Sequence, residues 1–238
     1  MQRTNRILFC VAILTAALCV APAFGQQKGR GGRGGFGGGD SLVTTAANED
    51  VQKDIGASGD LVAKINSLRD DLMAARQKEY QTAGINPQNF RDITPEQRQK
   101  MAEINAKLNE EFNTKLNALV KADQYKRLQQ IQLQAGLTGV RFNPAALTGK
   151  EVATELALAD DQRQKLTALA REFGEKQREL FSGGNFDVAA SAKLREEFTA
   201  KTMEVLNETQ KEKLKALKGP EFDVSKLGFG GGRRGKGN

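Results

Sequence analysis

The most informative absences in this chain are those of histidine and cysteine, the side chains that most often carry catalysis and metal binding. The 238 residues include no histidine, no tryptophan and only two cysteines, Cys10 and Cys19. Both cysteines lie in an N-terminal segment that we expect to be removed, which would leave a mature chain without thiols or disulfides. These absences exclude the common zinc sites, Ser–His and Cys–His catalysis, and haem ligation by histidine. We therefore expect no catalytic residues, no metal site, no cofactor and no enzymatic activity.

The first 25 residues have the three parts of a secretory signal peptide. Arg3 and Arg6 form the basic start, Ile7–Val20 is an apolar run of 14 residues, and Ala23 and Gly25 are small residues before a cleavage point. The run is too short for a membrane-spanning helix, which needs about 20 residues. We expect cleavage after Gly25, rather than a retained anchor, and export across the inner membrane to the periplasm or cell envelope.

Excess positive charge is concentrated in two glycine-rich segments. Residues 26–40 and 228–238 together carry six lysines and arginines, whereas the body from Asp40 to Leu227 has 28 basic and 29 acidic residues. This low-complexity composition predicts disordered tails. The tails are either solvated linkers or contacts to an anionic envelope surface, and we expect no nucleic-acid partner for an exported protein.

Apolar residues recur at helical spacing through the body, and strand signals are nearly absent. The opposite faces carry Lys, Glu, Gln and Arg. This pattern predicts an all-α protein of long amphipathic helices. Residues at such spacing are most often core, but the sequence leaves open which of them remain exposed as a contact surface. The candidate apolar contact stripe consists of Leu108, Phe112, Leu194 and Phe198.

One helical stretch occurs twice. Residues 106–115 return as residues 192–201, 86 positions later, and nine of the 23 residues from 106 to 128 are identical in the second copy. The preceding residues match at a shift of 101 positions, as Val51 does with Val152. Self-similarity of this kind predicts a tandem duplication. The first copy is longer by 15 residues, which we place in Thr82–Glu96.

The duplication predicts two tandem helical-hairpin units with disordered Gly/Arg-rich tails. The predicted organisation is a signal peptide (1–25), a glycine-rich segment (26–40), a first helical unit (41–136), a linker (137–149), a second helical unit (150–227) and a glycine-rich tail (228–238).

A short pattern recurs at the predicted helix starts: an apolar residue, a capping residue, two mostly polar residues, then glutamine. It indicates a capping box, in which a side chain such as that of Thr94 accepts a bond from the backbone while Gln97 reaches back to the cap amide. A structural role is the simplest interpretation. The residues that carry the motif are Thr94, Gln97, Gln124, Asp161, Gln162, Asn207 and Gln210.

This pattern resembles the LTxxQ motif of the Spy/CpxP family of exported helical proteins. The clearest match is Ile93 followed by Thr94, Pro95, Glu96 and Gln97. Lys121, Ala159 and Asn207 take the threonine position in the other copies. The resemblance implies an ATP-independent chaperone, or a modulator of an envelope stress sensor, that acts as a thin curved dimer of long helices. Two fused units would imitate that dimer.

Two hypotheses about function follow. The first is a non-enzymatic, Spy/CpxP-like binding protein whose partners are unfolded or stressed envelope proteins, as a monomer or a homo-oligomer. The second is a structural or scaffolding envelope protein anchored by its cationic tails. Metal or stress sensing is a third hypothesis, which the missing His and Cys disfavour although carboxylate sites remain conceivable.

Overall fold

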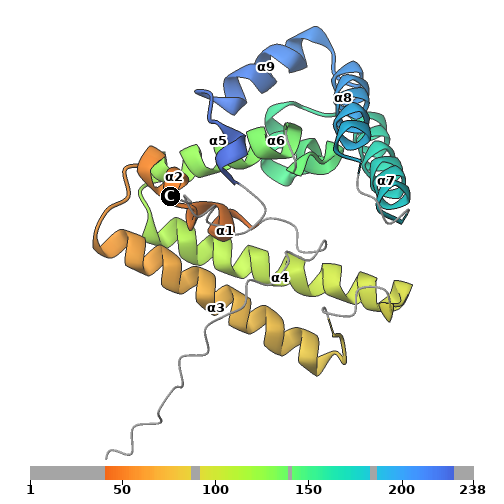
Figure 1. Ribbon diagram of the computed structural model, residues 1–238. Coiled ribbons are helices and arrows are strands. Elements are labelled where there is room, and N and C mark those ends of the chain that lie inside the picture. Colours follow the sequence, from red (N-terminus) through yellow and green to blue (C-terminus); the bar gives the residue numbers. More distant parts are fainter. Residues whose placement is uncertain (1–40, 87–91, 139–140, 183–186, 228–238) are drawn as a thin grey trace, which may run out of the picture. The chain divides into compact units, whose positions relative to one another are not determined.

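A computed structural model describes residues 41–86, 92–138, 141–182 and 187–227 of the chain. These residues form nine α-helices and short 3-10 helices, and no strand occurs among them. The predicted all-α class is therefore confirmed (Figure 1). The predicted signal peptide and both glycine-rich segments lie outside the described residues. No helix within the described ranges is long and apolar enough to span a membrane.

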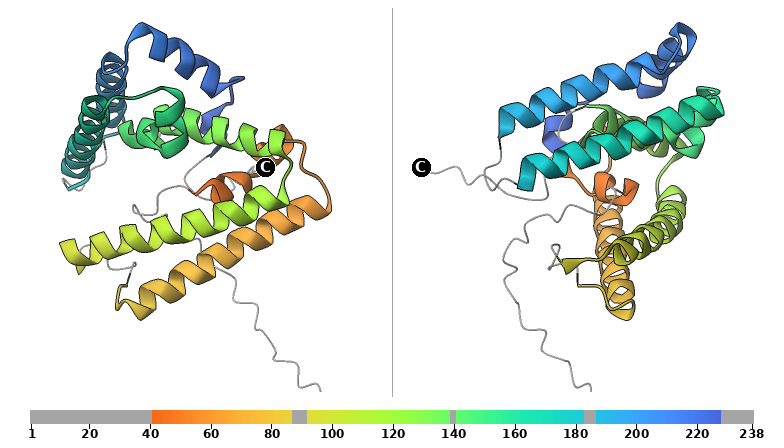
Figure 2. Two further views of the ribbon diagram at one scale, coloured as in Figure 1. Left: turned by 180° about the vertical axis from the view of Figure 1, so that it is seen from behind. Right: turned by 90° about the vertical axis from the view of Figure 1, so that its right-hand side faces the viewer.

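The first half of the described chain is built around two long helices that pack side by side, α3 and α4 (Figures 1 and 2). Its helices are α1 (Leu42–Ala46), α2 (Glu49–Asp54), α3 (Asp60–Thr82), α4 (Pro95–Leu119) and α5 (Ala122–Leu137). Ile65 and Leu72 of α3 share one apolar core with Leu108, Phe112 and Leu116 of α4. The helical spacing of these residues is what allows one face of each helix to be buried.

The second half contains another helix pair, α7 and α8. Its elements are η3 (Pro144–Thr148), α6 (Lys150–Glu155), α7 (Asp160–Ser182), α8 (Val188–Glu204), α9 (Glu208–Lys218) and η4 (Val224–Leu227). Phe173 lies at the centre of an aromatic cluster, with ring centroids 5.0 Å from Phe142 and 5.5 Å from Phe198. Such pairs add stability beyond the burial of their surface.

Helix boundaries recur at the two shifts found in the sequence. Helix α6 begins and ends 101 residues after α2, and α9 begins 86 residues after α5. Helix α4, with 25 residues, is longer than α8, with 17. Part of the difference in length between the two matching stretches of sequence therefore lies in α4 itself.

Each half contributes residues to the apolar core of the other half. Leu133 and Leu137, near the end of α5, pack with Leu147 and Leu214 of the second half. In the opposite direction, Phe222 and Leu227 at the C-terminal end of the described chain join the core of the first half.

Gln134 fastens this C-terminal segment to α5. Its side-chain nitrogen donates to the carbonyl oxygens of Lys218 and Pro220, at 2.7 and 2.8 Å, and its side-chain oxygen accepts from the backbone N–H of Phe222 at 2.8 Å. A buried amide with its bonds satisfied stabilises the segment that it holds. We call the segment from Gly219 to Leu227 the strap, because these bonds and its buried apolar residues hold it against the first half.

The aromatic cluster predicts a clear difference between two single substitutions in α8. Phe198→Ala should lower the free energy of unfolding by about 3–5 kcal/mol, because it removes a ring with 0% exposure from a packed core. Val188→Ala, at a side chain that is 65% exposed, should change it by less than about 0.5 kcal/mol. Urea unfolding followed by circular dichroism measures both. Equal midpoints for the two variants would contradict the packing described here.

Candidate functional site

The predicted capping motif forms the expected hydrogen bonds at two helix starts. At α4, the hydroxyl of Thr94 accepts from the backbone N–H of Gln97 at 3.2 Å, and the N–H of Thr94 donates to the side-chain oxygen of Gln97 at 3.0 Å. At α9, Asn207 and Gln210 form the same pair of bonds at 2.9 and 3.0 Å. Both are complete capping boxes.

The motif glutamine of α5 and that of α9 each form a further hydrogen bond to a distant part of the chain. The side-chain nitrogen of Gln124 donates to the carbonyl oxygen of Ile55 at 2.9 Å, and that of Gln210 donates to the carbonyl oxygen of Leu156 at 3.3 Å. Ile55 and Leu156 follow the equivalent helices α2 and α6. Each glutamine therefore caps its own helix with its oxygen and ties that helix to a distant carbonyl with its nitrogen.

The remaining motif residues have structural roles as well. Gln162, at the start of α7, accepts from the N–H of Ala159 at 3.1 Å and donates to the carbonyl oxygen of Val205 at 2.8 Å. Asp161 is exposed and lies 3.5 Å from the ammonium of Lys165. The motif residues thus lie at the starts of four helices, where they organise the fold. Two of them also meet: the side-chain nitrogen of Gln162 donates to the side-chain oxygen of Gln210 at 2.8 Å, and that of Gln210 donates to the side-chain oxygen of Gln162 at 2.9 Å.

The candidate apolar contact stripe is buried. Leu108, Phe112, Leu194 and Phe198 are between 0 and 9% exposed. They belong to cores because each lies on the face of α4 or α8 that packs against neighbouring elements. In this structure the four residues therefore do not offer the open apolar surface that a contact stripe needs. Among the described residues, the large hydrophobic side chains that are exposed are Met73 and Val188.

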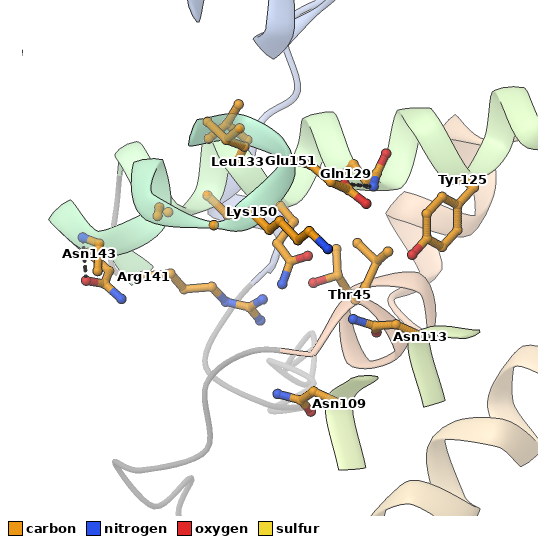
Figure 3. A pocket seen from close by; sticks show the side chains of 18 residues that line it. Thr45, Asn109, Asn113, Tyr125, Gln129, Leu133, Arg141, Asn143, Lys150 and Glu151 are labelled. Atoms are coloured by element: carbon orange, nitrogen blue, oxygen red, sulfur yellow. Dashed lines mark hydrogen bonds between the residues drawn. The ribbon is translucent and has the colours of Figure 1, made fainter. Parts of the chain in front are cut away.

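A cleft of about 820 Å³, lined by both polar and apolar residues, opens beside α4 (Figure 3). It is lined by residues of α1, α4, α5 and α6 and of the segment 141–149. Its volume is within the range of ligand-binding clefts. The polar side chains that the following argument uses are Thr45, Asn109, Asn113, Tyr125, Gln129 and Glu151.

Two buried oxygen atoms in this cleft have no hydrogen-bond partner. They are the hydroxyl oxygen of Thr45, a residue that is only 1% exposed, and the side-chain oxygen of Asn113. Buried polar atoms are nearly always satisfied in folded proteins, so these two atoms favour a polar group beside them, a water molecule included. Asn109 accepts from the guanidinium of Arg76 at 3.3 Å, and Gln129 donates to Glu151.

The equivalent face of α8 differs chemically. A second cavity of about 500 Å³ lies there, lined by Arg195 and Thr199, which match Asn109 and Asn113 at the sequence shift of 86 residues. Thr199 donates to the carbonyl oxygen of Arg195 at 2.8 Å, and Arg195 donates to the hydroxyl of Ser191 at 2.9 Å. These polar groups therefore have partners within α8.

The cleft perturbs the pKa of Tyr125. Burial raises the pKa of this phenol above its ordinary value of 10.0, and the negative charge of Glu151 raises it further. Because the folded state binds this proton more tightly than the unfolded chain does, Tyr125 contributes stability below pH 10.0 that is lost as the pH rises through its folded pKa.

Neither a cluster of metal-ligating side chains among the described residues nor a similar known protein was found. No group of three or more acidic side chains that could hold a metal ion occurs within the described ranges. Comparisons of the chain with models of protein families, with curated proteins and with solved structures found no match. The resemblance to Spy/CpxP proteins accordingly stays a prediction from the sequence motif.

The tertiary bonds of the motif predict that its glutamines differ in importance. Gln210→Ala should lower the free energy of unfolding by about 2 kcal/mol, because it breaks a cap and leaves buried partners unpaired. Gln97→Ala breaks the equivalent cap of α4. The additional bond of Gln97, from its side-chain nitrogen to the carbonyl oxygen of Gly84, is longer at 3.4 Å. This substitution should therefore lower the free energy of unfolding by about 1 kcal/mol or less. Urea unfolding of both variants checks this order. A larger loss for Gln97→Ala would contradict it.

The pKa of Tyr125 can be followed by titrating its ring signals in NMR spectra. We expect a midpoint above 10.0 in the wild type. Glu151→Gln should lower the midpoint without bringing it to the ordinary value, because burial is the larger cause. A wild-type midpoint at or below 10.0 would show that Tyr125 is not buried as described.

Proposed function

We propose that this chain is an exported, non-enzymatic helical binding protein of the Spy/CpxP type that holds unfolded or stressed envelope proteins. The signal-peptide pattern and the recurring capping motif support it. The observation that carries it is the open cleft beside α4, in which Thr45 and Asn113 present buried oxygen atoms without partners.

The burial of the apolar stripe changes how such a protein would hold its partner. A holding protein that uses hydrophobic contact needs an exposed apolar patch. In the described part of this chain the large apolar side chains are mostly buried, whereas two oxygen atoms of residues that line the cleft have no hydrogen-bond partner. Polar contact in the cleft therefore accounts better for binding than the stripe does.

We also propose that the helical body arose by duplication and consists of two tandem helical-hairpin units. It is supported by the helix boundaries that recur 101 and 86 residues apart and by the matching bonds of Gln124 to Ile55 and of Gln210 to Leu156. Each unit would pair two long helices and attach the next helix through a motif glutamine. Duplication leaves one copy free to diverge, as Asn109 and Asn113 do from Arg195 and Thr199.

An aggregation assay tests the proposed function. The mature protein should suppress the aggregation of a reduced or urea-diluted client at substoichiometric amounts. A full-length variant in which glutamine replaces the six tail cations should retain this activity, since the helical body carries it. The tail cations are Lys28, Arg30, Arg33, Arg233, Arg234 and Lys236.

No suppression by the wild type at a several-fold molar excess would overturn the proposal. If the tail variant instead releases the protein from envelope fractions while the wild type shows no effect on clients, the scaffolding hypothesis explains the chain better.

A further inference from the structure

Helix α4 carries a column of asparagines at intervals of four residues: Asn105, Asn109, Asn113 and Asn117. Asparagine has low helix propensity, so four of them in the interior of one helix need a reason other than helix stability. Asn105 has one, because it accepts a hydrogen bond from the hydroxyl of Tyr80 at 2.8 Å. Asn109 and Asn113 instead line the cleft beside α4.

The spacing of these two amides fits an extended polypeptide. Residues four apart on an α-helix are separated by about 6 Å along its axis. In an extended chain, every second residue presents its N–H and C=O to the same side, at intervals of about 6.6 Å. The NH₂ group of each asparagine can donate to a backbone C=O, and the unpaired oxygen of Asn113 can accept from a backbone N–H, whereas the oxygen of Asn109 already accepts from Arg76.

The cleft also supplies an acceptor and a hydroxyl without partners. The side-chain oxygen of Asn113 and the hydroxyl of Thr45 are buried and unpaired, and Figure 3 shows Thr45 together with Asn109 and Asn113 in the cleft. Thr45 comes from α1, whose packing against α4 and α5 holds it in place. A backbone that enters the cleft would give both groups a partner.

From this geometry we infer that the cleft beside α4 binds an extended polypeptide segment through its backbone, with the amides of Asn109 and Asn113 contacting alternate residues along α4. This inference rests on the proposed function and names the part of the client that is recognised. Backbone groups are common to all sequences, so such a site would accept many clients as long as they are unfolded. A folded protein would be excluded, because its backbone groups are already paired.

Fluorescence anisotropy with a labelled, unstructured Ser/Thr/Val peptide tests the inference on the full-length mature protein. The double variant Asn109→Ala/Asn113→Ala should bind the peptide about tenfold more weakly than the wild type, as expected for the loss of two amide contacts. Alanine favours helix more than asparagine does, so the substitutions should not unfold α4. The matched control, Arg195→Ala/Thr199→Ala in the equivalent face of α8, should bind like the wild type.

A peptide of the same sequence with N-methyl groups on alternate residues provides a second measurement that does not depend on the folding of a variant. Methylation removes backbone donors, so it should weaken binding to the wild type by about tenfold and should add little to the loss in the double variant. Equal binding of the two peptides by the wild type, or full binding by the double variant, would overturn the inference. Absence of peptide binding by the wild type would overturn it as well.

These outcomes are separate from those of the aggregation assay. If the wild type suppresses aggregation and the double variant binds peptide normally, the cleft is not the peptide-binding site and the proposed function stands. If the double variant loses peptide binding while the wild type suppresses no aggregation, the peptide site stands and the holding function fails.

Discussion

The burial of one face of α4 determines how this helix is turned, and the rest of the structure follows from that orientation. Leu108, Phe112 and Leu116 recur at helical spacing and are 5% exposed or less. Since they pack in the first core, Asn109 and Asn113 on an adjoining face are directed to the cleft. The same hydrophobic constraint that folds the helix thus presents its amides.

Glutamine links the helices through two uses of one side chain. Capping alone would stabilise a helix start, but Gln124, Gln162 and Gln210 also donate to carbonyl oxygens far away in the chain. This dual bonding explains why the motif favours glutamine over glutamate at the last position, because a carboxylate has no donor. Such hydrogen bonds join the helices together with apolar packing and with ion pairs such as that of Arg127 with Asp54 at 2.7 Å.

Much of the fold could be predicted from local sequence patterns. The all-α class followed from apolar periodicity, and the capping boxes at Thr94 and Asn207 followed from the spacing of cap and glutamine. The strap from Gly219 to Leu227 and the tertiary bonds of the glutamines were missed, because they join residues that no local pattern connects. Gln134, for example, meets Pro220 across 86 residues of sequence.

The cleft was also missed, although a signal for it was present. Four asparagines at intervals of four residues conflict with helix propensity, and such local conflicts tend to mark functional positions. The two matching stretches of sequence point to the same place. Within residues 106–115 and 192–201, Asn109 and Asn113 align with the different residues Arg195 and Thr199. The predicted apolar contact stripe included Phe112 and Phe198, which are buried. Helical spacing of apolar residues is the same in a core and in an exposed contact surface, so it could not distinguish the two.

The central claim is that the open face of α4, and not an apolar stripe, contacts an unfolded partner. The most direct measurement is an NMR titration of the side-chain NH₂ signals of asparagine with a urea-unfolded client diluted into buffer. The signals of Asn109 and Asn113 should shift, while those of Asn48 and Asn207, whose side-chain oxygens cap α2 and α9, should stay in place. Shifts confined to residues outside the cleft would contradict the account.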